Sequence, residues 1–250
     1  MVEPLLRVEN VSKRFGGLLA VGRASFAIEA GRITALIGPN GAGKTTLFAI
    51  ITGFLTPSEG RVLYDGADIA GEPPHRLARR GIARTFQIVQ PFAGLTVREN
   101  IAVGAHLSRP VRADALAAAG NVARTVGLAE FLDRPAASLT VAGRKRLELA
   151  RALAIEPRLL LLDEVLAGLN PSEIRDLVPV IQAVRDRGVT IVMIEHVMQA
   201  VMSLAEHVFV LSEGRIIAEG SPQAIAGDPR VVEAYLGRGA AARMAGAAHA

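Results

Sequence analysis

The chain has 250 residues, half of them hydrophobic and only 4% aromatic, so we expect a core built from leucine, isoleucine, valine and alanine. The net charge of +4 indicates nucleic-acid binding only weakly, and the absence of cysteine excludes disulfide bonds and thiolate metal sites. No apolar run reaches the roughly 18 residues of a membrane span, and the opening MVEPLLRVEN lacks the features of a signal peptide, so we expect the protein to stay in the cytosol.

The predicted elements change in character along the chain. The first third contains strands and turns: LLRVENVSKRF, then ASFAIEAGRITALIG with EAGR as an expected hairpin turn, then RVLYDG ending in an Asp-Gly turn. Residues 90 to about 155 are rich in alanine and are expected to be helical. The last hundred residues alternate apolar runs such as RLLLLD and TIVMI with helical patterns such as PSEIRDLVPVIQAVRDRG. Continuous apolar strands separated by helices predict a mainly parallel sheet covered on both faces.

The strongest motif is GPNGAGKT, residues 38 to 45. The apolar strand ITALI runs into it and a helix beginning TTLFAII leaves it, which is the context of a phosphate-binding loop and argues against a chance glycine-rich turn. Backbone N–H groups in such a loop approach phosphates closely, and the helix N-terminus adds its dipole. We expect Lys44 to bridge the β- and γ-phosphates and Thr45 to bind Mg2+. The expected nucleotide-binding residues here are Gly38, Pro39, Asn40, Gly41, Ala42, Gly43, Lys44, Thr45 and Thr46.

Acidic residues and a histidine follow two later apolar strands. RLLLLDE ends in Asp163, expected to hold Mg2+ through water, and Glu164, expected to act as general base; an acidic pair that caps the next helix is the alternative. TIVMI is followed by Glu195 and His196. Because the carboxyl ends of parallel strands meet at one edge of a sheet, we interpret His196 as a γ-phosphate sensor rather than a structural histidine. The remaining histidines, such as His75, His106 and His207, are assigned to the surface or to packing.

In this order, the motifs resemble the nucleotide-binding subunit of ABC transporters, over residues 5 to about 237. The resemblance implies that Phe15 stacks on adenine, and that Gln87 links Mg2+ and the attacking water to the transmembrane subunit. It also implies that AGLN, residues 167 to 170, touches the opposite subunit. FGGLLAV, GIARTFQ, LDEVLAGLNPSE and GRIIAEGSPQAI…VVEAYLG resemble the ATPase subunits of branched-chain amino acid importers, with features shared by other polar amino acid, amide and urea uptake systems.

One motif departs from the family. LTVAG, residues 139 to 143, lies where the family carries Leu-Ser-Gly-Gly-Gln, a signature that reaches across a dimer to the γ-phosphate on the other subunit. The resemblance therefore implies that Thr140, Val141, Ala142 and Gly143 contact ATP in trans. Two Cβ groups now crowd that surface, which leaves open whether it completes an active site. A helix is expected after Gly143, and its first turn, Arg144 to Arg146, is cationic, which suggests either a solvated face or contact with the partner's ATP. Val165 stands where the family usually has proline.

The resemblance implies an α/β P-loop NTPase core with a mainly parallel sheet, an N-terminal antiparallel β subdomain and an inserted α-helical subdomain. We expect one ATPase domain over residues 1–237, with the helical insertion at roughly 90–155, and a flexible low-complexity tail over 238–250. The cofactors would be ATP and Mg2+. The protein would lie peripherally on the cytoplasmic face of the cell membrane.

The implied partners are two transmembrane permease subunits, a second ATPase subunit that is non-identical or a second copy, and indirectly an extracytoplasmic solute-binding protein, with no nucleic acid. The apolar segment QIVQPFAGLTV, with Phe92 and Leu95, is either a docking surface for a permease helix or ordinary surface scatter. Two alternative functions remain: a soluble ABC-type ATPase acting on nucleic acid or ribosomes, and a non-hydrolysing regulatory subunit. The transported solute is not readable from this chain.

Overall fold

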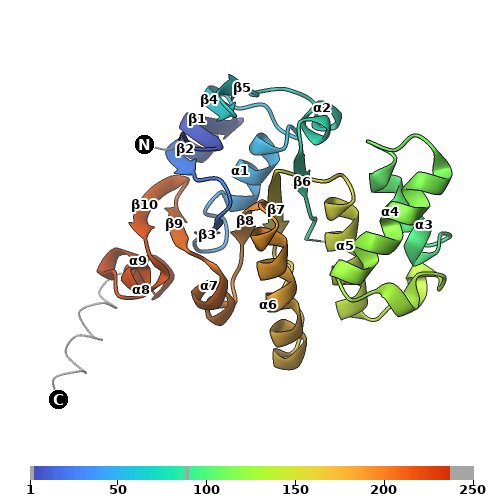
Figure 1. Ribbon diagram of the computed structural model, residues 1–250. Helices are drawn as coiled ribbons and strands as arrows, with labels where there is room; N and C mark the ends of the chain where they lie inside the picture. Colours follow the sequence, from blue (N-terminus) through green and yellow to red (C-terminus); the bar gives the residue numbers. More distant parts are fainter. Residues whose placement is uncertain (1–2, 88–89, 237–250) are drawn as a thin grey trace, which may run out of the picture.

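The computed structural model describes residues 3–87 and 90–236, and its centre is a six-stranded sheet with the order β10-β9-β3-β8-β7-β6 (Figure 1). Every pair from β9 to β6 is parallel, and β10 alone runs antiparallel, to β9. The prediction of an α/β fold with a mainly parallel sheet is confirmed. The strands are β3 (Ile33–Ile37), β6 (Ile82–Arg84), β7 (Leu159–Asp163), β8 (Thr190–Ile194), β9 (His207–Ser212) and β10 (Arg215–Gly220).

The inner strands are apolar throughout because both of their faces are covered. All five residues of β7 are buried. Leu160 and Leu162 pack into one core cluster with the helices α3 to α7, whereas Leu159 and Leu161 pack into a second cluster with α1 and the N-terminal strands. Alternate residues of one strand thus belong to opposite layers, as the period of two in a strand requires.

The N-terminal strands form a separate antiparallel sheet with the order β2-β1-β4-β5. The expected EAGR hairpin is wrong: residues 29–32 carry the chain from β2 in this sheet to β3 in the central sheet, where β3 pairs with β8 and β9. The physical reason lies in the burial pattern, since β2 alternates between buried and exposed residues along most of its length while β3 is buried at every position. The strands are β1 (Leu6–Phe15), β2 (Leu18–Ile28), β4 (Glu59–Tyr64) and β5 (Ala67–Asp68).

A group of helices lies to one side of the central sheet, drawn in green and yellow in Figure 1. It consists of α3 (Val97–Ala105), α4 (Arg112–Thr125) and α5 (Val141–Leu153), with 3-10 turns at Ala129–Phe131 and Ala136–Ser138. Helix α5 begins earlier than expected. The hydroxyl of Thr140 accepts a hydrogen bond from the N–H of Gly143 at 3.1 Å, so Thr140 is the N-cap and the signature residues form the first turn.

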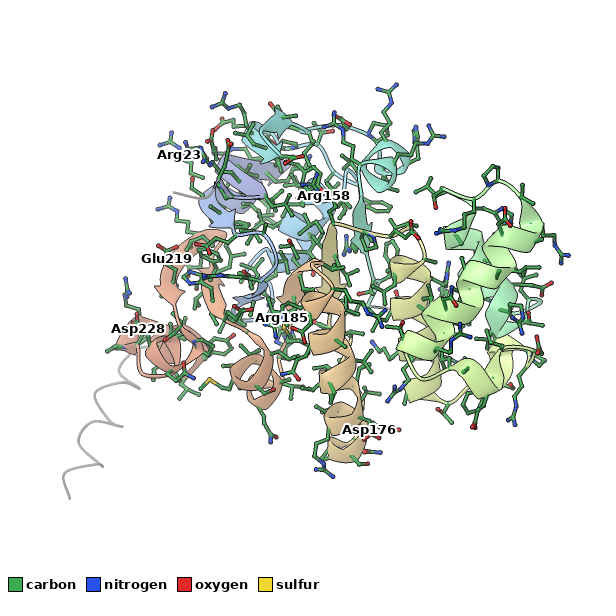
Figure 2. All side chains as sticks on the ribbon, in the orientation of Figure 1. Arg23, Arg158, Asp176, Arg185, Glu219 and Asp228 are labelled. Atoms are coloured by element: carbon green, nitrogen blue, oxygen red, sulfur yellow. The ribbon has the colours of Figure 1, made fainter. Side chains whose placement is uncertain are left out.

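The remaining helices cover the sheet or follow its last strand. Arg185 of α6, labelled in Figure 2, donates to Glu206 at 2.8 Å, and the same carboxylate accepts from the backbone N–H of Ile33 at the start of β3. No helix in the described part of the chain is both long enough and apolar enough to cross a membrane. The tail at 238–250 lies outside the described residues. The helices that cover the sheet or follow its last strand are α1 (Lys44–Ile51), α2 (Pro74–Arg79), α6 (Pro171–Asp186), α7 (Met198–Leu204), α8 (Pro222–Ala226) and α9 (Pro229–Leu236).

Candidate active site

The loop between β3 and α1 has a backbone that only glycine permits at two positions. Gly38 has φ 150°, and a Cβ there would lie 1.9 Å from the carbonyl oxygen of Leu211. Gly43 has φ 103°, and a Cβ there would lie 2.4 Å from the carbonyl oxygen of Ala20. The motif therefore fixes a loop that wraps the N-terminus of α1, where the unpaired backbone N–H groups of the first turn favour a phosphate.

Lys44 lies inside this loop. Its Nζ donates to the carbonyl oxygens of Gly38 at 2.7 Å and Pro39 at 3.0 Å, and the residue is only 6% exposed. Burial lowers the pKa of Lys44, opposed by the negative charges of Glu164 and Asp163. The ammonium thus rests on two backbone carbonyl oxygens, which a phosphate could replace as hydrogen-bond acceptors.

Glu164 is held at both carboxylate oxygens. Nε2 of Gln87 donates to Oε2 at 2.7 Å, and Nε2 of His196 lies 2.8 Å from Oε1. The backbone of Glu164 is also fixed: its N–H donates to Ile194 O at 3.0 Å, and its carbonyl oxygen accepts from Lys145 Nζ at 3.0 Å. These contacts hold a non-glycine residue at φ 51°, a conformation that costs free energy on its own. The structure thus brings together the three residues predicted to be catalytic.

Asp163 is the last residue of β7, directly before Glu164, and is 1% exposed. Its Oδ2 accepts from Arg84 Nη2 at 2.6 Å, and its N–H donates to Thr85 Oγ1 at 3.0 Å. Oδ1 is buried and has no hydrogen-bond partner among the described residues. Sequence reasoning missed Arg84, although the signal was available: an arginine at the end of a short apolar strand, three residues before Gln87.

The three residues predicted to bind the metal line one cavity: Thr45, Gln87 and Asp163. The unpaired Oδ1 of Asp163 and the hydroxyl of Thr45 are hard oxygen donors of the kind that Mg2+ prefers. In the described part of the chain no cluster of three histidine or acidic side chains could hold a metal by itself. The donor set therefore fits an ion that takes its other ligands from phosphates and water.

Phe15 ends β1 with 45% of its surface exposed, and Lys13 Nζ lies 5.3 Å from its ring centroid. The ammonium of Lys13 lies over one face of the exposed ring, and an exposed aromatic ring of this kind is able to stack on a base. The other predicted nucleotide-binding residues of the loop, Pro39 to Gly43, lie between β3 and α1 as the motif requires.

The three cations after the signature bind carbonyl oxygens of this chain, and Arg144 is exposed to solvent as well; contact with a partner's ATP stays a prediction. Arg144 donates to the carbonyl oxygens of Leu139 at 3.1 Å and Ala137 at 3.0 Å, and Arg146 donates to Val126 O at 2.9 Å. Lys145 holds Glu164, as described above. Each side chain thus fixes a loop of this chain by binding a carbonyl oxygen. In the signature itself, Val141 is 60% exposed at the start of α5.

The loop after Glu164 is fastened to the next strand. The N–H of Leu166 donates to Oε1 of Glu195 at 2.9 Å, and Val165, in the place of the family's proline, is buried. Asn170 caps α6 by accepting from the N–H groups of Ser172 and Glu173. Glu195 is a second residue that the sequence left without a role, because a buried acidic residue beside His196 gives no pattern of its own.

Comparison with known proteins decides the family. The profile of the ABC transporter family matches residues 21–167, and a profile described as a branched-chain amino acid ATP-binding cassette transporter matches residues 215–241. The chain belongs to the ABC transporter family. The ABC cassette of this chain, with its Lys44 loop and Glu164, is an ATPase, as predicted.

Relatives cover nearly the whole cassette. The chain is 40% identical, over 95% of its own length, to the high-affinity branched-chain amino acid transport ATP-binding protein BraF of Pseudomonas aeruginosa, and it spans 99% of that protein. It is 39% identical to LivG of Escherichia coli, with the same coverage. A solved ABC transporter cassette in its ADP conformation superposes with a TM-score of 0.86 at 33% identity, covering 95% of this chain and 100% of the other. The predicted ABC ATPase fold is confirmed, and the relatives favour the transporter hypothesis over both alternatives.

Proposed function

We propose that this chain hydrolyses ATP to drive the import of branched-chain or related amino acids through separate permease subunits. The relatives BraF and LivG carry that solute class in their names. The observation that carries the hydrolytic role is the carboxylate of Glu164, fixed between Gln87 and His196 at the sheet edge from which the Lys44 loop emerges.

Each residue has a proposed task. Glu164 takes the proton of the attacking water, and the hydrogen bond from Gln87 to its Oε2 keeps the carboxylate aimed. Lys44 leaves its backbone carbonyls for the β- and γ-phosphates, and His196 contacts the γ-phosphate. Asp163, Thr45 and Gln87 hold Mg2+, which neutralises phosphate charge when bound. Phe15 stacks on adenine.

We propose that residues 1–237 form one ATPase domain with the helices at roughly 90–155 inserted in it. In a head-to-tail pair with a second ATPase subunit, the Thr140–Gly143 signature faces the partner's nucleotide. The side chain of Val141 projects from the first turn of α5, where a glycine would let phosphate approach the backbone. We propose that the pair is unequal: the site that contains Lys44 and Glu164 is the main hydrolytic site, and the site faced by Val141 is slower.

A permease helix has a place to bind. Phe54, Phe86 and Val103 are exposed and line a groove of about 250 Å3 between α2, α3 and α5, here called the docking groove. Phe54 and Phe86 meet edge to face at 5.6 Å. Exposed aromatic surface of this kind is typical of a protein interface. The groove extends the surface predicted from QIVQPFAGLTV.

Within that segment, Phe92 is exposed and Leu95 is half-buried, and Ile88 and Val89 lie outside the described residues. A permease in this groove would place the chain peripherally on the cytoplasmic face of the membrane. An extracytoplasmic solute-binding protein would act on the same permease from the other side.

The test is reconstitution. The chain is co-expressed with the permease and second ATPase subunit, and the purified complex is placed in vesicles with the solute-binding protein. We expect ATP hydrolysis to rise with binding protein loaded with a branched-chain amino acid, and labelled solute to accumulate. Hydrolysis that no amino acid stimulates would contradict the importer function. RNA or DNA retained by the isolated chain in filter binding at physiological salt would favour a nucleic-acid role instead.

A further inference from the structure

Helix α5 carries a row of three charged residues on successive turns: Lys145, Glu148 and Arg151. The helix lies between the strands β6 and β7 and the helices α3 and α4 (Figure 1). A spacing of three places the side chains along one side of the helix. Lys145 and Glu148 are each only 6% exposed. The three residues are here called the α5 row.

Glu148 binds the start of the segment that contains Gln87. Its Oε1 accepts a hydrogen bond from the backbone N–H of Phe86. Burial raises the pKa of Glu148, opposed by that hydrogen bond and by the charges of Lys145 and Arg151. Phe86 lies in the docking groove, and the next residue, Gln87, binds Glu164. This one hydrogen bond therefore fixes the backbone between the groove and the residue that binds Glu164.

The outer members of the row bind on either side of that junction. Arg151 Nη1 donates to Gln90 O at 3.0 Å, and its guanidinium lies 4.6 Å from the ring centroid of Phe92. Lys145 Nζ donates to Glu164 O at 3.0 Å. One helix therefore holds both ends of the Phe86–Phe92 segment and the backbone of the predicted general base.

Stability alone does not account for these residues. Buried charged side chains lose hydration, and apolar residues of similar size often stabilise a protein as well or better. The rest of the buried surface of α5 is apolar, with Leu147, Leu149 and Ala150. The side chains of the α5 row instead bind backbone groups of loops next to the site, as residues that position those loops would.

We propose that Lys145, Glu148 and Arg151 are positioning residues whose contacts with the backbone at Glu164, Phe86 and Gln90 set the place of Gln87 and Glu164. Glu148 and Arg151 line the cavity that also contains Thr45, Gln87 and Asp163, and they act there through the loop that carries Gln87. The proposal rests on the proposed function, because the reaction that these residues would support is the hydrolysis assigned to Glu164. The same helix starts at the signature, so a shift of α5 would move all three contacts together.

The decisive comparison is between Glu148→Leu and Glu148→Gln in the assembled complex. Leucine removes the acceptor for Phe86 N–H, whereas the glutamine side chain keeps an acceptor oxygen and loses only the charge. We expect Glu148→Leu to lower kcat about 10-fold with KM for ATP unchanged within about twofold, because small misplacements of catalytic groups are costly while the phosphate loop is untouched. Glu148→Gln should restore kcat to within about twofold of the original. Glu130→Leu, the same change at an exposed position, should leave kcat unchanged.

A second measurement is independent of hydrolysis. Amide hydrogen exchange at Phe86 in the full chain should be faster with Glu148→Leu and unchanged with Glu148→Gln. If Glu148→Leu does not fold, Arg151→Met and Arg151→Lys provide the same contrast at a half-buried position, with only lysine preserving kcat.

The outcomes separate the two proposals. A complex that hydrolyses ATP and keeps normal kcat with Glu148→Leu overturns the positioning role and leaves the proposed function standing. A Glu148→Gln variant as slow as Glu148→Leu overturns it too. A complex with no ATP hydrolysis at all contradicts the proposed function, and the exchange of the Phe86 amide then decides whether the contact is made.

Discussion

Replacing Glu195 with glutamine should change how the stability of this protein depends on pH. Glu195 follows β8 directly and is 1% exposed. Its Oε1 accepts from Leu166 N–H, and its Oε2 is buried with no hydrogen-bond partner among the described residues. Burial, opposed by the Leu166 hydrogen bond, raises the pKa of Glu195 from 4.5 to about 7. Glutamine keeps the acceptor for Leu166 and removes the titration.

The direction and size of the effect follow from this shift. The folded protein binds the proton of Glu195 more tightly than the unfolded chain does. The free energy of unfolding therefore includes a contribution that is fully present below about pH 4.5 and is lost as the pH rises through about 7. At about 1.4 kcal/mol per pKa unit, the whole contribution is about 3 kcal/mol, most of it lost between pH 5 and pH 8.

Urea unfolding of the full chain at pH 5, 6, 7 and 8 measures this contribution. All other titrating groups are shared, so the difference between Glu195→Gln and the original protein isolates Glu195. We expect that difference to move in favour of the variant by about 2–3 kcal/mol across the range. Glu130→Gln, the same change at an exposed glutamate, is the matched control. Parallel curves for Glu195→Gln would refute the reasoning and mean that the buried carboxyl ionises as easily in the folded protein as in the unfolded chain.

Three further predictions concern the nucleotide. Glu164→Gln should lower ATP turnover of the complex by about 10²- to 10⁴-fold while ATP still binds, because the shape is kept and the basic lone pair is lost; unchanged turnover would remove Glu164 as the base. Phe15→Ala should cost about 1–3 kcal/mol of ATP affinity, with Phe15→Tyr nearly silent, as measured by calorimetric titration; equal affinities would place Phe15 outside the site. Val141→Gly with Ala142→Gly should raise turnover at the partner's nucleotide, read by inactivating each catalytic glutamate in turn. Equal losses from the two inactivations in the unmodified complex would disprove the asymmetry.

The sequence predicted those parts of the site that lie in short contiguous motifs. The Lys44 loop and Glu164 follow apolar strands and Asp163 ends one, and such local patterns fix both the residue type and the edge of the sheet. The roles of Gln87 and Phe15 came from resemblance to a family, because neither has a local pattern that distinguishes it from a surface residue. The structure brings Gln87 to within 2.7 Å of Glu164, 77 residues away in the sequence.

Contacts that depend on the order of strands were not predictable. Arg84 meets Asp163 because β6 pairs with β7, and no pattern near residue 84 states that pairing. The EAGR hairpin failed for the same reason: a glycine-containing turn predicts a reversal but not which strand lies next to β3. The start of α5 was misplaced because the sequence shows the cations at 144–146 clearly, whereas the Thr140 cap is a single hydroxyl.

Binding of a nucleotide would have to replace some of the contacts that Lys44 and Glu164 make in this structure. Lys44 Nζ donates to two backbone carbonyls, and a phosphate competes for the same ammonium protons. If Nε2 of His196 carries the proton shared with Glu164 Oε1, the same N–H cannot donate fully to a γ-phosphate as well. Binding of ATP would therefore draw His196 away and leave Oε1 free to accept the proton of water. Gln87 would still hold Oε2, and Gln87 follows the residue that Glu148 binds. The nucleotide would thus change the contact at one oxygen of the carboxylate while Gln87 keeps the other in place.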